Sequence, residues 1–278
     1  MNESSHLPTV NQWLENSTRQ LSAAGIPSAR LDAEVLLAHT LRKPRTWLHA
    51  HSEEELDSRT IDIASARIDL RLDRVPVAYI VGHKEFYGRP FKVTTATLIP
   101  RPESESIIDL LKTALTSRPE PLQLVDVGTG SGALGITAKI IAPQLDVTLI
   151  DTSRYALAVA EKNAFAHHVE VELIESNLLE AYPHVADIII ANLPYVDRGW
   201  ERSPETDHEP AEALFAENNG LALIESLIQQ TRGKLVQNGA LILEADPTQH
   251  EAIKKVATTN GLILAKTEGY ALLFEKLR

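Results

Sequence analysis

The stretch "LQLVDVGTGSGALG", residues 122–135, decides the fold that we expect for this chain. Its first half reads as a buried strand, and glycines follow at once at positions 128, 130 and 132. Glycines after a strand let the backbone approach a ligand closely, and the start of the next helix adds free N–H groups. We therefore predict a strand, a ligand-binding turn and a helix, in that order.

Strands and helices alternate on the C-terminal side of this stretch. Continuous apolar strands separated by helices indicate a parallel sheet covered on both faces. The last two predicted strands, 262–267 and 270–276, are joined by Glu268-Gly269, which is short enough for an antiparallel hairpin. We predict an α/β fold with a mostly parallel seven-stranded sheet. Its other strands are "LQLVDVG", "VTLID", "VELIE", "ADIIIAN" and "ALILEAD", and its helices cover 132–141, 153–166, 218–236 and 248–258.

The N-terminal side of the stretch reads as a small helical bundle over residues 1–75. Thr9 and Gln12 form a capping-box pattern, and the Ser52–Glu55 stretch forms a second one, expected to open another helix. A helix after Pro27-Ser28 should bury one face, consisting of Leu31, Val35, Ala38 and Leu41. Glycines and prolines then punctuate β-rich pieces such as "PFKVTTATLI". We expect a hairpin linker over 76–103 and a second domain over 104–278.

Charge and composition narrow the classes of partner. Residues 1–84 hold 10 Lys and Arg against 11 Asp and Glu, and the remaining residues hold 17 against 27. A phosphate backbone demands clustered cations, so we expect no direct nucleic-acid binding. No secretory signal is visible, and the apolar runs fall far short of the roughly 20 residues that span a bilayer. We expect a cytoplasmic protein without membrane contact, acting as a monomer.

The glycine motif admits two nucleotide cofactors. Residues 130–135 match G-x-G-x-x-G, with Asp151 at the end of the next strand, which favours a nicotinamide cofactor. That match, however, begins two residues late. The full pattern, Asp126-x-Gly128-x-Gly130-x-Gly132, resembles the first motif of class I S-adenosylmethionine-dependent methyltransferases. The resemblance implies a Rossmann-like methyltransferase fold with S-adenosyl-L-methionine as cofactor. It implies cofactor contacts at Gly128, Thr129, Gly130, Ser131, Gly132, Asp151, Asn177, Leu178 and Asn192.

A second motif ends the fourth strand, in "IIIANLPYVDRGW", residues 188–200. Asn192 to Tyr195 resemble the Asn-Pro-Pro-Tyr motif of methyltransferases that modify planar amide or amino nitrogens, with Leu193 in place of the first proline. The resemblance implies that the Asn192 side-chain oxygen and the Leu193 carbonyl accept the two N–H groups of the substrate nitrogen. It implies that Tyr195 packs on the flat group. Asn192, Leu193, Pro194 and Tyr195 are therefore the predicted catalytic and substrate-binding residues.

Further segments extend the resemblance over nearly the whole chain. "AGIPSARLDAEVLLAHTL", "LIPRPESE", "ANLPYV" and "HEPAEALF" occur in the order typical of the bacterial release-factor glutamine methyltransferases. That family implies N5-methylation of the glutamine in the Gly-Gly-Gln motif of class I peptide release factors, with the N-terminal bundle as recognition domain. Leu193 and Asn177 depart from its pattern, Asn177 standing where an Asp is usual. Glu209 and Pro210 either line the substrate mouth or form an ordinary loop, and Pro102 and Glu103 either join the site or start a helix.

Other activities stay open at this point. A glutamine methyltransferase of a ribosomal protein or a nucleic-acid adenine N6-methyltransferase would use the same Asn192 motif. The only evidence for a nicotinamide oxidoreductase is the literal G-x-G-x-x-G match. The evidence for a degenerate cofactor-binding protein is the presence of Leu193 and Asn177 in place of the usual residues. The ten histidines show no metal-ligand spacing, and the chain has no cysteine, so we predict no metal site.

Overall fold

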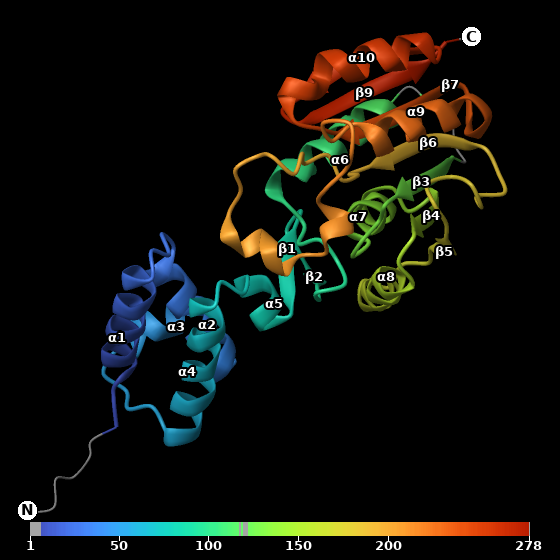
Figure 1. The fold of residues 1–278 in the computed structure, drawn as a ribbon. Coiled ribbons are helices and arrows are strands. Elements are labelled where there is room, and N and C mark those ends of the chain that lie inside the picture. The colour runs from blue at the N-terminus through green and yellow to red at the C-terminus, as the bar shows by residue number, and fades with distance from the viewer. Residues whose placement is uncertain (1–6, 117, 119–121, 278) are drawn as a thin grey trace, which may run out of the picture. The chain divides into compact units, whose positions relative to one another are not determined.

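Figure 1 shows the protein as a computed structural model that describes residues 7–116, 118 and 122–277. The described chain divides into two compact units. The first unit ends at Gly82 and also contains a later segment, Ser203–His208. The second unit begins at His83, stops at Arg202 and resumes at Glu209. The chain therefore leaves the second unit between two of its elements and then returns to it.

The first unit is built from helices, as predicted. The box at the start of its first helix is confirmed: the Thr9 hydroxyl accepts from the Gln12 N–H at 3.3 Å, and the Gln12 side chain accepts from the Thr9 N–H at 3.0 Å. These bonds satisfy N–H groups that a helix start leaves without partners. The elements are α1 (Val10–Ala23), α2 (Ala29–Leu41), α3 (Arg45–Ala50), α4 (Ser58–Leu72), α5 (Val77–Val81) and the 3-10 helix η2 (Pro204–His208).

The second predicted capping box is wrong. Ser52–Glu55 opens no helix, and α4 begins only at Ser58. Asp57 caps it, because one carboxylate oxygen accepts from the Thr60 N–H at 2.9 Å. Aspartate and serine are both good helix caps, so the first of two candidates along the chain need not be the one that is used.

The predicted buried face of α2 is also wrong in part. Leu31 is 47% exposed, whereas Leu36 and Leu37 are fully buried. Ala33 shares the buried face. Because α2 carries apolar residues on most of its circumference, their spacing does not select one face, and packing against α1 and α4 decides.

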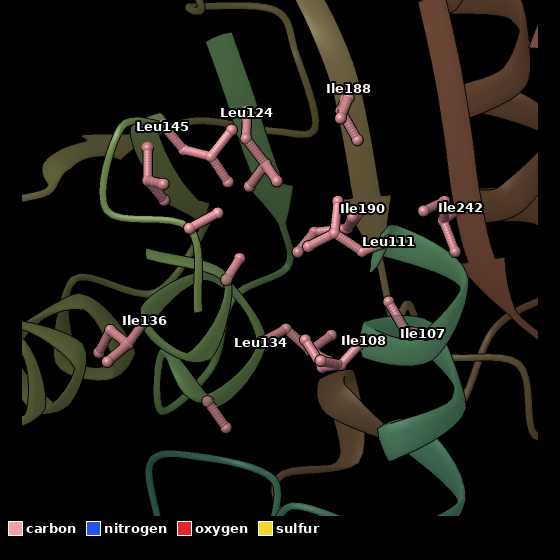
Figure 2. Close-up of a cluster of buried hydrophobic side chains, with 14 of the residues drawn as sticks. Ile107, Ile108, Leu111, Leu124, Leu134, Ile136, Leu145, Ile188, Ile190 and Ile242 are labelled. Carbon is pink, nitrogen blue, oxygen red and sulfur yellow. The ribbon is translucent and has the colours of Figure 1, made fainter. Parts of the chain in front are cut away.

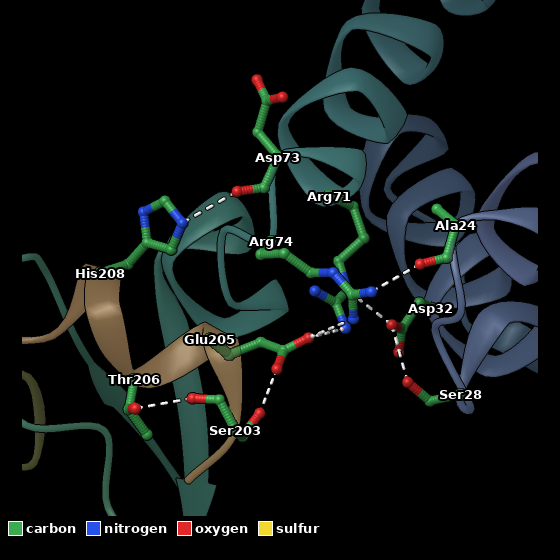
Figure 3. Close-up of polar contacts among 10 residues, drawn as sticks. All are labelled: Ala24, Ser28, Asp32, Arg71, Asp73, Arg74, Ser203, Glu205, Thr206 and His208. Atoms are coloured by element: carbon green, nitrogen blue, oxygen red, sulfur yellow. Dashed lines mark hydrogen bonds and ion pairs between the residues drawn. The ribbon is translucent and has the colours of Figure 1, made fainter.

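Arg71, near the end of α4, joins three elements of the first unit (Figure 3). Its guanidinium donates to Asp32 of α2 at 2.7 Å and to Glu205 of η2 at 2.9 Å. The Arg71 and Asp32 side chains are only 6% and 9% exposed. Burial alone would raise the pKa of Glu205, but hydrogen bonds from Ser203 and Arg71 lower it to about 2. Buried charge therefore holds η2 against the helices of this unit.

The second unit contains a short hairpin and the predicted sheet. The hairpin pairs β1 (His83–Phe86) with β2 (Arg89–Lys92), so within residues 90–99 only the start is in a strand. The large sheet has the strand order β5-β4-β3-β6-β7-β9-β8, in which β9 is antiparallel to both of its neighbours and the other pairs are parallel. Its strands are β3 (Gln123–Val127), β4 (Asp146–Asp151), β5 (Glu172–Glu175), β6 (Ala186–Ala191), β7 (Leu235–Glu244), β8 (Leu262–Glu268) and β9 (Ala271–Lys276).

This sheet confirms the predicted α/β class, including the antiparallel final hairpin. The strand order reverses between β3 and β6, because the chain runs outward from β3 to β5 and returns on the other side of β3. Open α/β sheets bind ligands at the carboxyl ends of the strands beside such a reversal. The turn after β3 and the Asn192 motif after β6 both lie at this edge.

Helices cover both faces of the sheet (Figure 1). One core packs α6 (Glu105–Leu115), α7 (Ala133–Ile141) and α8 (Arg154–Ala166) against the sheet, and Figure 2 shows part of it. The other core packs α9 (Ala222–Lys234) and α10 (His250–Thr259) on the opposite face. Helix α6 follows η1, in agreement with the helix start that was one of the two readings of Pro102 and Glu103, and its Ile107, Leu111 and Ala114 have helical spacing. The 3-10 helices are η1 (Pro102–Ser104), η3 (Ala211–Ala213) and η4 (Pro247–Gln249).

Gly135 brings α7 into direct contact with the sheet. A Cβ there would lie 2.3 Å from Leu149 Cδ2 and 3.0 Å from Asp126 Cβ. Gly135→Ala should therefore lower the free energy of unfolding by about 1–3 kcal/mol, the usual cost of overpacking. Gly233→Ala in α9 is the matched control, because nothing lies within 4 Å of its Cβ position. Denaturant unfolding followed by circular dichroism measures both, and equal stabilities would show that α7 packs more loosely than this.

Candidate active site

The turn from β3 to α7 lies at the carboxyl edge of the sheet and contains three glycines. Gly128, Gly130 and Gly132 have φ of +71°, +54° and +81°, in the left-handed region that favours glycine. The N–H groups of Gly128 and Thr129 donate to the Ile150 carbonyl at 2.8 and 2.9 Å, which ties the turn to β4. Nothing lies within 4 Å of the Cβ position at Gly130. A ligand can therefore approach the turn closely at this residue.

Asp126 supports this turn from within the core. Its Oδ2 accepts from the Thr129 hydroxyl at 2.6 Å and from the Gly135 N–H at 2.9 Å. Burial raises the pKa of the Asp126 carboxyl to about 6, even though these two bonds oppose the rise. Its Oδ1 is buried and has no hydrogen-bond partner within the described part of the chain. Asp126 thus fixes the shape of the turn.

Asp151, the last residue of β4, faces the same turn. Its two carboxylate oxygens accept from the N–H groups of Gly130 and Ser153, each at 2.9 Å. Burial raises the pKa of the Asp151 carboxyl, and the charge of Glu212 adds to the rise. A carboxylate has about four lone-pair sites, so each oxygen can still accept a bond from a ligand hydroxyl.

The residues after β5 form another part of the pocket lining. Asn177 and Leu178 line the pocket, and the Leu178 side chain is 6% exposed. The Asn177 side chain donates from Nδ2 to Glu180 at 2.8 Å. Its carbonyl oxygen is therefore the end of the amide that can serve a ligand amine.

The Asn192 motif closes the site after β6. Asn192 donates from Nδ2 to the Ser104 hydroxyl at 2.8 Å. Leu193 is 5% exposed, and its Cδ2 lies 2.9 Å from the Cβ position of Gly128. The leucine side chain therefore packs against the glycine turn, so it contributes contact where a proline would contribute rigidity. Pro194 lines the pocket.

Tyr195 lies outside the pocket lining. Its hydroxyl donates to Glu244 Oε1 at 3.0 Å, and its carbonyl accepts from Gln249 at 2.9 Å. Burial and the Glu244 charge raise the pKa of Tyr195. The packing of this ring on a substrate therefore stays a prediction.

One pocket joins these strand ends, with about 1020 Å³ of empty space, part of it open to solvent. The pocket extends from the glycine turn to Asn192, so it can hold a cofactor at one end and a substrate side chain at the other. Of the predicted site residues, the following line it: Gly128, Thr129, Gly130, Ser131, Asp151, Asn177, Leu178, Asn192, Leu193, Pro194 and Pro210. Gly132, Tyr195 and Glu209 lie beside the pocket without lining it.

Glu209 and Pro210 have different roles. The Glu209 side chain is 1% exposed, pairs with Arg101 and accepts from the Ile99 N–H at 3.0 Å. This carboxylate therefore fastens the loop that carries Pro210 to the segment before α6, while Pro210 itself faces the pocket.

Several lining residues were not predicted. Pro102 and Glu103 were considered at the start of α6, but both are exposed, and it is Ser104 beside them that is buried and lines the pocket. Ser104 lies within the quoted segment "LIPRPESE", next to Glu103, so its hydroxyl was the available signal. The other unpredicted lining residues include Phe86, Thr97, Leu98, Glu212, Ala213 and Leu223.

The described residues contain neither a metal cluster nor a membrane-spanning helix. Within residues 7–116, 118 and 122–277, no three His, Cys, Asp or Glu side chains are grouped so as to hold a metal ion. None of the helices described in this structure is long and apolar enough to cross a membrane.

Two family models and several solved structures match this chain. Residues 12–82 match the model of the PrmC N-terminal domain, and residues 106–217 match that of the methyltransferase small domain. Among solved structures, a methyltransferase from Pyrococcus furiosus has a TM-score of 0.52 at 17% identity, covering 77% of this chain and 98% of its own. A T. thermophilus 16S rRNA N2 G1207 methyltransferase, solved with AdoMet and guanosine, has a TM-score of 0.51 at 18% identity, covering 70% of this chain and 50% of its own. Both confirm the fold.

Curated relatives are similar over nearly their whole length. The release factor glutamine methyltransferase of Aliivibrio fischeri is 34% identical over 265 residues, covering 94% of this chain and 93% of its own. Its counterpart in Deinococcus radiodurans is 35% identical, covering 91% of each chain. The counterpart in Escherichia coli K12 is 33% identical, covering 90% of each chain. The chain belongs to the family of release factor glutamine methyltransferases.

Proposed function

We propose that this protein transfers a methyl group from S-adenosylmethionine to the side-chain amide nitrogen, N5, of the glutamine in the Gly-Gly-Gln motif of class I peptide release factors. One observation carries the proposal: a single pocket joins the glycine turn after β3 to Asn192 after β6. Family membership supports the choice of substrate.

The residues present fit S-adenosylmethionine. Gly130 leaves open space for a close approach, and Asp151 has lone pairs for ribose hydroxyls. Leu178 offers an apolar surface and Asn177 an amide oxygen for an adenine ring and its amine. When bound, this cofactor supplies an electrophilic methyl group on a sulfonium. The acidic pocket suits its positive charge.

The Asn192 motif would orient the glutamine nitrogen. An amide nitrogen is a weak nucleophile because its lone pair is delocalised, so positioning and electrostatics must do most of the catalysis. In the structure Asn192 Nδ2 donates to Ser104, which leaves Oδ1 to accept a substrate N–H. The backbone carbonyl of Leu193 would accept the second N–H. Transfer would form the nitrogen–carbon bond as the sulfur–methyl bond breaks, with its electron pair left on sulfur, and the nitrogen would then lose one proton to water.

Asp151→Ala should weaken S-adenosylmethionine binding by about 1–3 kcal/mol, because ribose hydroxyls would lose a buried acceptor. Asp146→Ala, at the opposite and exposed end of β4, should leave the affinity unchanged. Calorimetry with S-adenosylmethionine and with NAD measures both variants against the parent protein. Saturable binding of NAD with none of S-adenosylmethionine would overturn the cofactor assignment.

We also propose that the helical unit recognises the release factor. The near-neutral charge of residues 1–84 and the match to the PrmC N-terminal domain support this role. We expect the protein to act as a cytoplasmic monomer that binds no nucleic acid directly. Amide hydrogen exchange should slow in α1 to α5 when a release factor is added. Protection confined to the second unit would contradict the proposed recognition.

The substrate assignment is tested by labelled methyl transfer. A purified class I release factor should accept label, and the same factor with alanine for its Gly-Gly-Gln glutamine should not. Ribosomal proteins and adenine-containing DNA serve as competitors. Equal labelling of the alanine-substituted factor, or preferred labelling of a competitor, would contradict the proposed substrate.

A further inference from the structure

Glu244 is a buried carboxylate with no evident role in the fold. It ends β7, beside the end of β6, where Ala191 pairs with Leu243. Glu244 is 1% exposed, and none of the ion pairs found among the described residues includes it. A buried charge without a cation costs several kcal/mol. Polar side chains must therefore stabilise this carboxylate in place of a cation. Those side chains belong to the Asn192 motif and its neighbours.

Glu244 contacts the Asn192 motif through Tyr195. Its Oε1 accepts from the Tyr195 hydroxyl at 3.0 Å. Its Oε2 is buried and, among the described residues, makes no hydrogen bond of ordinary geometry. Burial raises the pKa of the carboxyl, and the neighbouring polar side chains of Ser104, Tyr195 and Asn192 oppose the rise. Asn192 in turn donates to Ser104 at 2.8 Å. Glu244, Tyr195, Asn192 and Ser104 thus form one cluster at the pocket, of which Asn192 and Ser104 line the pocket itself.

The Asn192 amide can direct either its Nδ2 or its Oδ1 toward the pocket, and the surrounding groups must select one of these two orientations. A serine hydroxyl both donates and accepts, so Ser104 alone would tolerate either the NH₂ or the carbonyl end of Asn192. An ionised carboxylate only accepts, so next to Glu244 the carbonyl end would be repelled. The NH₂ end therefore faces Glu244 and Ser104, and Oδ1 faces the pocket.

We infer that Glu244 is a positioning residue that selects the amide orientation of Asn192 and fixes Tyr195 behind it. This role deepens the proposed function and depends on it, because the selected orientation is the one that offers Oδ1 to a substrate N–H. Glu244 itself does not line the pocket and acts through its neighbours.

Glu244→Gln replaces the acceptor-only group by one that both donates and accepts. The single-turnover methyl-transfer rate should fall about tenfold, a fraction of the 10²–10³ lost when an oriented group is removed. Affinity for S-adenosylmethionine should stay unchanged by calorimetry. Glu251→Gln, exposed on α10, is the matched control. In an Asn192→Ala background the Glu244→Gln change should have no further effect, because the group that it orients is gone.

A cofactor-free readout separates this inference from the proposed function. In the free protein, the ¹⁵N signal of the Asn192 side-chain amide should move as Glu244 titrates, and should not move in Glu244→Gln. The titratable groups near the cluster are Glu103 and Tyr195, with Tyr270 and Asp246 near Tyr195. An Asn192 signal that titrates identically in both proteins would overturn the role of Glu244, whether or not the protein methylates a release factor.

Ser104→Ala tests the same point if Glu244→Gln does not fold. Because Glu244 would still select the orientation, the rate should fall by no more than about tenfold, well short of the 10²–10³ expected for loss of Asn192 itself. A loss as large as that of Asn192→Ala would assign the orientation to Ser104 and overturn the inference. A Glu244→Gln effect that persists in full in the Asn192→Ala background would overturn it as well.

Discussion

Asn192→Ala should lower the single-turnover rate of methyl transfer by about 10²–10³, the usual effect of removing one oriented group that stabilises a transition state. The substrate N–H becomes more acidic as the methyl group moves to nitrogen, so its bond to Asn192 Oδ1 strengthens in the transition state. Affinity for the cofactor should change little, because Gly130 and Asp151 make separate contacts. Rapid-quench transfer to a release factor, with calorimetry alongside, measures the two quantities independently.

Leu193→Pro is the matched control for this prediction. It keeps the backbone carbonyl at position 193 and restricts φ, at the loss of the leucine contact with the Gly128 turn. We expect its rate to stay within about threefold of the parent, far from the effect of losing an oriented group. If Asn192→Ala kept the parent rate, the motif would be structural and the proposed chemistry would need another acceptor.

Arg71→Ala should destabilise the helical unit by about 3–5 kcal/mol, the usual cost of breaking a buried ion pair from one side. Asp32 would be left 9% exposed without its cation, and Glu205 would lose one of its two arginines. In a Trp200→Phe background the remaining tryptophans, Trp13 and Trp47, both lie in the helical unit. Their fluorescence during denaturant unfolding reports on that unit.

Arg59→Ala is the control for Arg71→Ala, since Arg59 is exposed on the same helix. Exposed ion pairs contribute about 0–1 kcal/mol, so this variant should unfold near the parent midpoint. Equal midpoints for the two variants would show that the Arg71 cluster does not hold η2 in place.

The sheet could be predicted from the sequence because its strands are continuous apolar runs between helices. β3 and β6 are buried along most of their length, so their sequences alone indicate a sheet covered on both faces. The glycine turn was equally visible, since Gly128 and Gly130 need positive φ. Local chemistry decides both features.

The remaining features depend on contacts between distant segments. Glu205 and Arg71 are 134 residues apart, and no local pattern in either segment indicates that they meet. Ser104 and Asn192 are 88 residues apart. Glu209 was an ambiguous loop residue because its role depends on Arg101, which lies in another segment. Tertiary packing, which spacing and propensity do not encode, decides such pairs.

Fragmentation mass spectrometry of a class I release factor, incubated with the protein and S-adenosylmethionine, tests most directly whether this protein methylates the glutamine nitrogen. We expect one added methyl group on the glutamine of the Gly-Gly-Gln motif, absent with the Asn192→Ala protein. An unmodified motif, or a methyl group on another residue, would contradict it.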